Sequence, residues 1–171
     1  QAAPFANIVE RMQSMLVEDL AATEALLIER AKSPVDVIPD LSGYIVSAGG
    51  KRLRPMITLI AAHACGGTNA GTHALATAVE FIHTATLLHD DVVDMSTLRR
   101  GRPTVNAAWN NPSSVLVGDF IYSRAFQVLV SIGNLSIMEI MANTTNKIAE
   151  GEVLQLLAKS NPQPSERDYM R

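Results

Sequence analysis

The sequence has little of several features that define other classes of protein. A single cysteine, Cys65, excludes a disulfide scaffold. Aromatic residues make up 5% of the 171 residues and charged residues 18%, which is below the roughly 25% charge typical of soluble domains. No run approaches about 18 uncharged apolar residues, so we expect no membrane span. Strand-like alternation and internal repeats are also missing, which leaves helices as the expected regular structure.

The composition that is present indicates a folded domain. Hydrophobic residues make up 47% of the chain, which is too many for a disordered protein. The formal net charge of -3 argues against bulk binding of nucleic acid. The length suits one domain or one large piece of a domain. No basic, apolar leader precedes the first helical segment, so we expect no signal peptide.

Apolar residues recur at helical spacing in almost every long segment. The first three expected helices cover residues 5–31, 39–50 and 55–65, and Gly49-Gly50 ends the second of them. The predicted fold class is all-α, with about six complete helices and one partial helix.

The remainder of the chain continues this helical pattern. The expected elements are a helix capped by Thr72 that runs to about Met95, a loop over 96–112 with at most a short helix around Asn106, a helix from Ser113 or Ser114 to about Ile132, a helix with a capping box of Ser136 and Glu139 that runs to about Lys159, a turn at 161–164, and a helix start at Ser165–Asp168.

The charged residues are sorted along the chain by sign. Residues 41–79 and 95–118 contain no Asp or Glu, and each of these windows holds one tight basic cluster. The two clusters contain six of the 14 basic residues: Lys51, Arg52 and Arg54, then Arg99, Arg100 and Arg102. Either cluster alone could be an ordinary solvated surface. Together with the acidic residues between them they indicate bound ions, because concentrated like charges are unfavourable without counter-charge.

Three aspartates lie between the basic clusters, at the expected C-terminal end of the long helix. Asp90 and Asp94 are four residues apart and share one helix face, with Asp91 beside it. Carboxylates at this end of a helix oppose its macrodipole and therefore favour a bound cation. A ligand set of oxygen atoms alone suits a hard ion such as Mg²⁺, which usually completes its shell with water and substrate phosphates. Acid clusters are common, so the motif alone is weak evidence.

The basic clusters are suited to binding phosphate. Lys51 and Arg54 lie between two glycines and a helix start, where free backbone N–H groups also favour anions. Arg99 and Arg100 follow the aspartates closely, and arginine binds phosphate oxygens in a bidentate manner. His83 lies seven residues before Asp90, on the same face, although a lone helical histidine is often just a packed residue. We infer a cavity for a phosphate-bearing substrate bridged by Mg²⁺.

These motifs resemble those of the trans-isoprenyl diphosphate synthases. The resemblance covers most of the chain from about residue 35, and it is nearest to the long-chain polyprenyl branch (octaprenyl to decaprenyl). The matching segments are Gly-Gly-Lys-Arg-Leu-Arg-Pro at 49–55, Phe-Ile-His at 81–83, Leu-His-Asp-Asp-Val-Val-Asp at 88–94, Leu-Arg-Arg-Gly at 98–101 with Pro103, Gly-Asp-Phe at 118–120 and Glu-Gly-Glu-Val-Leu-Gln-Leu at 150–156. Each is modest alone, but their order and spacing are specific.

The resemblance implies an all-α isoprenoid synthase bundle, normally a homodimer, that makes the lipid tail of a quinone such as ubiquinone. It implies a cytoplasmic, bacterial-type enzyme, with the mitochondrial matrix as an alternative, and two substrates, isopentenyl diphosphate and an allylic prenyl diphosphate. Carried over by position, Asp90 and Asp94 bind Mg²⁺ and the allylic diphosphate, with Asp91 in support. Arg99 contacts the allylic diphosphate. The residues implied for isopentenyl diphosphate are Lys51, Arg54, His83 and Arg100.

The resemblance also suggests a long product. In this family a bulky aromatic residue just before the aspartates closes the product tunnel early. Ala85 and Thr86, which occupy this position, are small and leave such a tunnel open. The alternative is that small residues are there simply for helix packing.

The chain departs from the family pattern after Asp94. A second aspartate-rich motif and a Lys-Thr pair, which complete the family's diphosphate site, are not found. We therefore expect residues 1–171 to be one truncated synthase domain, its N-terminal half, and to be inactive alone.

Two other functions fit the sequence less well than an enzyme does. A non-catalytic helical subunit or interaction module of the same fold would have no need of Asp90, Asp94 or Arg99. A basic-patch nucleic-acid binder is disfavoured by the acidic triad between the patches and by the net charge.

Overall fold

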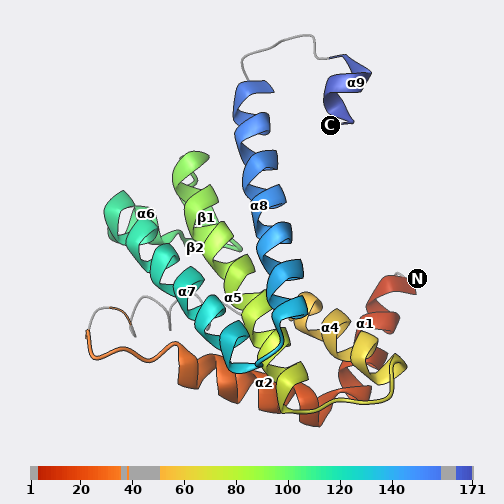
Figure 1. Ribbon diagram of the computed structural model, residues 1–171. Helices are drawn as coiled ribbons and strands as arrows, with labels where there is room; N and C mark the ends of the chain where they lie inside the picture. Colours follow the sequence, from red (N-terminus) through yellow and green to blue (C-terminus); the bar gives the residue numbers. More distant parts are fainter. Residues whose placement is uncertain (1–3, 36–37, 39–50, 159–164, 171) are drawn as a thin grey trace. The chain divides into compact units, whose positions relative to one another are not determined.

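Helices form nearly all the regular structure of the described residues, which are 4–35, 38, 51–158 and 165–170 of a computed structural model (Figure 1). The chain divides into two compact units, Gln1–Gly133 and Asn134–Arg171. The first unit contains α1 (Pro4–Met15), α2 (Val17–Arg30), α4 (Leu53–Ala64), α5 (Ala70–Val93), β1 (Leu98–Arg99), β2 (Arg102–Pro103), α6 (Val105–Ala108) and α7 (Asn111–Ser131); the second contains α8 (Leu135–Ala158) and α9 (Glu166–Tyr169). The all-α prediction is confirmed. None of the described helices has the length and apolar character needed to cross a bilayer.

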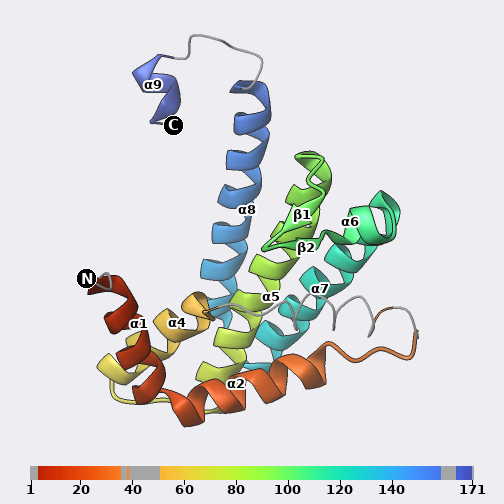
Figure 2. The same cartoon turned by 180° about the vertical axis from the view of Figure 1, so that it is seen from behind.

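Helix α5 is the centre of the first unit. It packs against α7 on one side and α4 on the other, and α2 crosses it (Figures 1 and 2). Side chains on several faces of α5 are therefore buried, including Ala76, Ala78, Phe81, Ala85 and Leu88. The alanines leave room for neighbouring helices to approach closely, and Phe81 fills the remaining volume.

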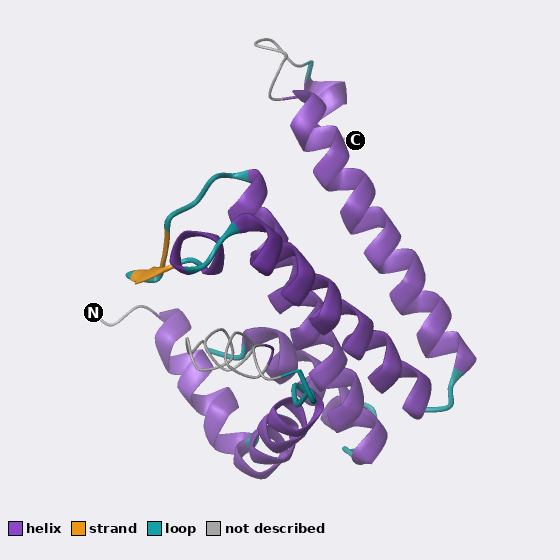
Figure 3. Ribbon diagram, turned by 90° about the vertical axis from the view of Figure 1, so that its left-hand side faces the viewer, coloured by secondary structure: helices purple, strands orange, loops and turns teal. Residues whose placement is uncertain are grey.

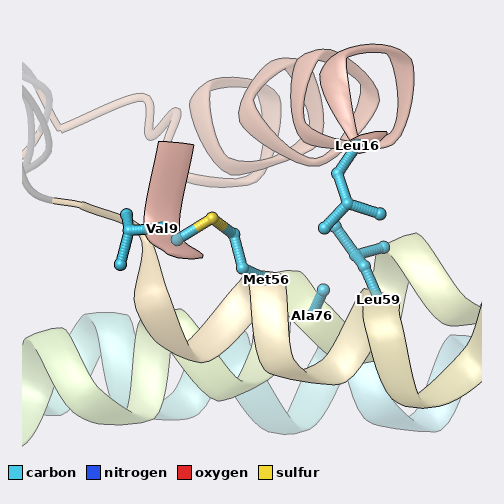
Figure 4. Close-up of a cluster of buried hydrophobic side chains, with 5 residues drawn as sticks. All are labelled: Val9, Leu16, Met56, Leu59 and Ala76. Atoms are coloured by element: carbon cyan, nitrogen blue, oxygen red, sulfur yellow. The ribbon is translucent and has the colours of Figure 1, made fainter. Parts of the chain in front are cut away.

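The predicted single helix over residues 5–31 is wrong, because the chain breaks at Leu16 between α1 and α2. Leu16 has φ -114° and ψ 17°, and its N–H donates to the carbonyl of Gln13 at 3.2 Å rather than continuing the α-helical pattern. The break turns the Leu16 side chain toward Leu59, into a buried cluster with Val9, Met56 and Ala76 (Figure 4). Periodicity alone misses this break, since apolar residues continue at helical spacing on both sides of it.

Asparagine residues cap three of the helices, and the predicted Ser and Thr caps are wrong. In α5 the side chain of Asn69 accepts from the N–H of Thr72 at 3.1 Å, so Thr72 is the third helical residue of a capping box. Asn110 accepts from the N–H of Ser113 at 2.8 Å, so α7 begins before both predicted serines.

Helix α8 begins with the third of these asparagine caps. Asn134 accepts from the N–H of Ile137 at 3.1 Å, in place of the predicted Ser136–Glu139 capping box. In each helix the capping asparagine lies three residues before the residue whose N–H it accepts from. It caps the helix in place of a nearby Ser or Thr.

The loop predicted over residues 96–112 contains a two-stranded hairpin that was not expected (Figure 3). Strands of two residues are too short to give an alternating pattern. The short helix predicted around Asn106 is confirmed as α6, and the helix start predicted after Ser165 is confirmed as α9. The helix expected from Pro39 to Gly49-Gly50, the end at Lys159 and the turn at 161–164 lie outside the described residues.

One carboxylate joins α2 to both ends of the connection between α4 and α5. Asp19 Oδ2 lies 2.7 Å from His63 Nε2, and Asp19 Oδ1 lies 2.7 Å from His73 Nε2 and accepts from Thr68 Oγ1 at 2.8 Å. The hydrogen bond with His73 is the largest effect that lowers the pKa of Asp19, to about 2. The carboxylate is thus ionised at all ordinary pH values and holds three separate donors.

Helices α5 and α7 are in contact, and Gly118 of α7 faces a side chain of α5. The imidazole of His89, on α5, lies over this glycine, with Nε2 3.3 Å from the carbonyl of Val115 and 3.2 Å from Oδ1 of Asp119. A Cβ atom at position 118 would lie 2.7 Å from Cδ2 of His89 and closer still to Nε2. The helix spacing here therefore depends on glycine.

We expect Gly118→Ala in the full-length protein to lower the free energy of unfolding by about 1–3 kcal/mol, because the new methyl group overlaps the His89 ring. Chemical denaturation measures this change. In a His89→Ala background the same substitution should be much better tolerated. Equal losses in the two backgrounds would show that the overlap with His89 is not the cause.

Candidate functional site

A pocket of about 590 Å³ opens on one face of α5 in the first unit. Its walls come from the start of α4, the hairpin and the start of α6. The lining residues are Lys51, Arg52, Leu53, Arg54, Glu80, His83, Thr84, Leu87, Leu88, Asp91, Arg99, Arg100, Arg102, Pro103, Thr104 and Val105. Six of these side chains are basic and two are carboxylates, so the lining carries a strong excess of positive charge.

The pocket brings together six of the residues to which the resemblance gives a site role: Lys51, Arg54, His83, Asp91, Arg99 and Arg100. On α5, Glu80, Thr84, Leu87 and Asp91 line it at spacings of four, three and four residues, which places them in one stripe along the helix. Two basic clusters almost fifty residues apart thus face the same stripe.

Arg52 forms ion pairs with acidic residues of the protein, and these contacts stabilise the first basic cluster. It adopts the left-handed conformation with φ 46°, directly before α4. Its guanidinium donates to both oxygens of Glu24 on α2, at 3.0 and 2.9 Å, and to Glu80 on α5 at 2.9 Å. Burial lowers the pKa of Arg52, but these hydrogen bonds more than offset that effect. These ion pairs fix the backbone between Lys51 and Arg54.

Sequence reasoning missed this role because it gave no function to Glu24 or Glu80. The one available signal was that Glu80 is the first acid after the long acid-free window. Because both glutamates lie far from Arg52 along the chain, residue spacing alone cannot identify them as its partners.

Asp91 forms the base of the second basic cluster. It is 5% exposed, and both of its carboxylate oxygens accept from Nε of Arg99, at 3.1 and 3.0 Å, while Nη2 of Arg99 donates at 2.8 Å. The hydrogen bonds with Asp91 raise the pKa of Arg99 above its ordinary value. The metal-supporting role implied for Asp91 stays a prediction. In this structure its contacts orient Arg99.

Polar side chains hold the hairpin against the C-terminal end of α5. Thr104 Oγ1 donates to the carbonyl of Ser96 at 2.8 Å, and the Asn106 amide donates to the carbonyls of Ser96 and Asp91 at 3.0 and 3.3 Å. These bonds satisfy backbone acceptors where the helix ends and fix the segment that carries Arg99 and Arg100.

His83 is an uncharged imidazole in a positively charged wall. Burial, together with the nearby charges of Arg54, Arg100 and Arg99, lowers its pKa to about 4. At neutral pH it therefore offers one N–H donor and one acceptor to a ligand without adding charge.

Asp90 and Asp94 lie beside the pocket rather than in its lining. Burial and, second to it, the charge of Asp94 raise the pKa of Asp90, so the ionised form of Asp90 is less stable here than that of an isolated aspartate in water. Two carboxylates one helical turn apart under this strain have the hard oxygen chemistry that fits a divalent cation. Within the described ranges no three His, Cys, Asp or Glu side chains form a metal site, so further ligands would come from substrate or water.

The two residues linked to product length also lie outside the pocket lining. Ala85 has no exposed surface, whereas Thr86 is half-buried and its hydroxyl donates to the carbonyl of His83 at 2.8 Å. Their role in product length stays a prediction.

Comparison with known proteins finds a match between residues 35–171 and the family model described as Polyprenyl synthetase. The octaprenyl diphosphate synthase of Escherichia coli (strain K12) is 51% identical over 163 residues, which are 95% of this chain and 50% of that protein. The chain therefore spans about half the length of the curated relatives it matches.

Solved structures of similar proteins have the same fold over the residues that they share with this chain. A decaprenyl diphosphate synthase from Rhodobacter capsulatus is 52% identical with a TM-score of 0.90, over 94% of this chain and 50% of that one. A polyprenyl synthase from Caulobacter crescentus CB15, complexed with calcium and isoprenyl diphosphate, is 46% identical with a TM-score of 0.90, over 94% and 49%. The predicted isoprenoid synthase fold is confirmed, with about half of it covered by this chain.

We expect Arg54→Gln to raise the pKa of His83 by about half a pH unit or more, because it removes one of the charges that disfavour imidazolium. An NMR titration of the His83 ring signals in the full-length protein measures this value. Arg11→Gln, which removes an exposed arginine of α1 away from the pocket, is the matched control and should leave it unchanged. An unaltered value in Arg54→Gln would mean that burial alone sets the pKa.

Proposed function

Because the chain belongs to the polyprenyl synthetase family, we propose that its protein condenses an allylic prenyl diphosphate with isopentenyl diphosphate to make a long-chain all-trans polyprenyl diphosphate, the side chain of a quinone. The observation that carries the proposal is the pocket itself, which pairs an excess of basic side chains with the carboxylates Asp90 and Asp94 at its edge. This charge pattern suits two diphosphates and a cation.

Asp90 and Asp94 are the proposed ligands of Mg²⁺. The raised pKa of Asp90 supports this assignment, because a bound cation relieves the unfavourable charge. When bound, Mg²⁺ supplies positive charge that stabilises the departing diphosphate. Arg99, oriented by Asp91, is proposed to bind the same allylic diphosphate.

Lys51, Arg54, His83 and Arg100 are the proposed ligands of isopentenyl diphosphate. All four line the pocket, and Arg52 stiffens the backbone that carries Lys51 and Arg54. A neutral His83 can donate a hydrogen bond to a phosphate oxygen without repelling the neighbouring arginines.

The proposed reaction changes the bonding in three steps. The C1–O bond of the allylic diphosphate breaks and its electron pair leaves with the diphosphate. The double bond of isopentenyl diphosphate then supplies the electrons for a new carbon–carbon bond to C1. A proton next to the resulting cation then passes to the released diphosphate, and its bonding electrons form the new double bond. Arg99 stabilises the leaving anion, and apolar walls such as Leu87 and Leu88 keep water from the cation.

Several properties of the whole protein belong to the same proposal. Residues 1–171 form part of one synthase domain, the assembly is a homodimer, and the setting is the bacterial cytoplasm, with the mitochondrial matrix as the alternative. The bacterial relative from Escherichia coli supports the first setting. A non-catalytic subunit of the same fold remains the competing function, and turnover by the full-length protein decides between the two.

The charge on Asp90 is expected to be needed for function but not for folding. Asp90→Asn in the full-length protein should reduce turnover of an allylic diphosphate and isopentenyl diphosphate by about 1,000-fold or more, because one metal ligand is lost. Its thermal midpoint should be unchanged or higher, since a strained charge is removed. Glu10→Gln, on the exposed surface of α1, is the control and should retain activity. Near-normal turnover by Asp90→Asn would refute the metal assignment.

Product length is expected to depend on the size of residues 85 and 86. Thr86→Phe should shorten the products resolved by chromatography, because a bulky aromatic side chain at this half-buried position would close the proposed tunnel early. Ala85→Phe should act in the same direction. Because Ala85 is completely buried, the larger side chain overpacks the site, so folding is checked first by circular dichroism. Unchanged products from a folded Thr86→Phe variant would contradict the tunnel.

A further inference from the structure

Two carboxylates of helix α2, Asp19 and Glu24, bond to residues at opposite ends of α4. Asp19 bonds to His63, in the last turn of α4, at 2.7 Å. Glu24 accepts from Arg52, the residue directly before α4, through both of its oxygens at 3.0 and 2.9 Å. Both contacts join α2 to α4, but of these four described residues only Arg52 lines the pocket.

Arg52 has an unusual backbone conformation, which its side-chain contacts help to hold. Its φ of 46° is uncommon for a non-glycine residue, and such a conformation persists only where the surrounding structure maintains it. Lys51 precedes this residue and α4 begins directly after it, so the backbone angles of Arg52 set the position of Lys51 relative to the helix. The two bonds to Glu24 fix the direction of the guanidinium as well as its distance.

Glu24 is not among the described residues that line the pocket, so any effect it has on a bound ligand is indirect. It is half-buried on α2, whereas Glu80, which also accepts from Arg52, does line the pocket. Removing the negative charge of Glu24 would by itself favour an anionic ligand nearby. Releasing Arg52 would instead displace Lys51 and weaken binding of the same ligand. These two effects have opposite signs, so the direction of the change distinguishes them.

We propose that Glu24 is a positioning residue for isopentenyl diphosphate, which holds Arg52 and thereby places Lys51 for that substrate. The inference rests on the proposed function, which assigns Lys51 to isopentenyl diphosphate. The allylic diphosphate is affected much less, because Arg99 is oriented by a different carboxylate, Asp91. Helix α2 thus takes part in the affinity for one substrate, although none of its residues, all of which the structure describes, lines the pocket.

The test measures steady-state turnover of the full-length protein with Mg²⁺ present, using isopentenyl diphosphate with geranyl or farnesyl diphosphate as the allylic substrate. Glu24→Gln keeps the size of the side chain but loses its charge and one acceptor oxygen. It should raise the KM for isopentenyl diphosphate roughly five- to tenfold, and change kcat and the KM for the allylic substrate by less than about twofold. Glu24→Asp keeps the charge on a shorter side chain and should raise the same KM to a smaller extent.

Asp19→Asn is the matched control, because it weakens the other contact between α2 and α4 and leaves the bonds of Arg52 in place. It should lower the thermal midpoint of unfolding at least as much as Glu24→Gln does, and leave both KM values within about twofold of the unmodified protein. This comparison separates positioning of the substrate from a general loss of stability.

Three results with Glu24→Gln would overturn the role of Glu24 while the proposed function stands. They are an unchanged or lower KM for isopentenyl diphosphate, an equal rise in the KM for the allylic substrate, and an equal rise in the Asp19→Asn control. If Glu24→Gln does not fold, an unchanged KM in Glu24→Asp overturns the role in the same way. Absence of turnover by the unmodified protein with either allylic substrate would overturn the proposed function, and the inference with it.

Discussion

The pocket depends on one partly buried ion-pair network, in which Arg52 bonds to Glu24 and Glu80. These contacts join α2, α4 and α5, three helices whose packing defines one wall. Breaking such a network by removing one partner leaves an uncompensated charge behind, which is far more damaging than its net contribution suggests. The left-handed backbone at Arg52 is sustained by the same contacts. Arg52, the middle residue of the first basic cluster, therefore fixes the positions of Lys51 and Arg54 on either side of it.

The two sides of the pocket are built in the same way from different residues. On each side one arginine bonds to a carboxylate of α5, Arg52 to Glu80 and Arg99 to Asp91, and holds its basic neighbours in place. Eleven residues separate the two carboxylates, about three turns of one helix. Helix α5 thus sets the distance between the two basic clusters, and a rigid helix suits that task better than a loop.

The features that could be predicted from the sequence are those that depend on local spacing. Helical periodicity revealed α4, α5, α7 and α8, and the sorting of charge singled out Lys51, Arg54 and Arg99, which line one pocket. The features that could not be predicted depend on tertiary contacts that residue spacing does not reveal. The break at Leu16 follows from packing against Leu59, and nothing in the residues around it indicates a break. The pairing of Asp91 with Arg99 likewise required the hairpin, whose strands are too short to be recognised.

The bonds made by Asp19 have a consequence for how the first unit opens. His63 lies in the last turn of α4, Thr68 in the connection and His73 in the first turn of α5, and all three bond to this one carboxylate. Local opening that releases Asp19 frees all three segments at once. Their amide protons should therefore exchange with solvent as a single cooperative block, rather than fraying residue by residue from the loop outward.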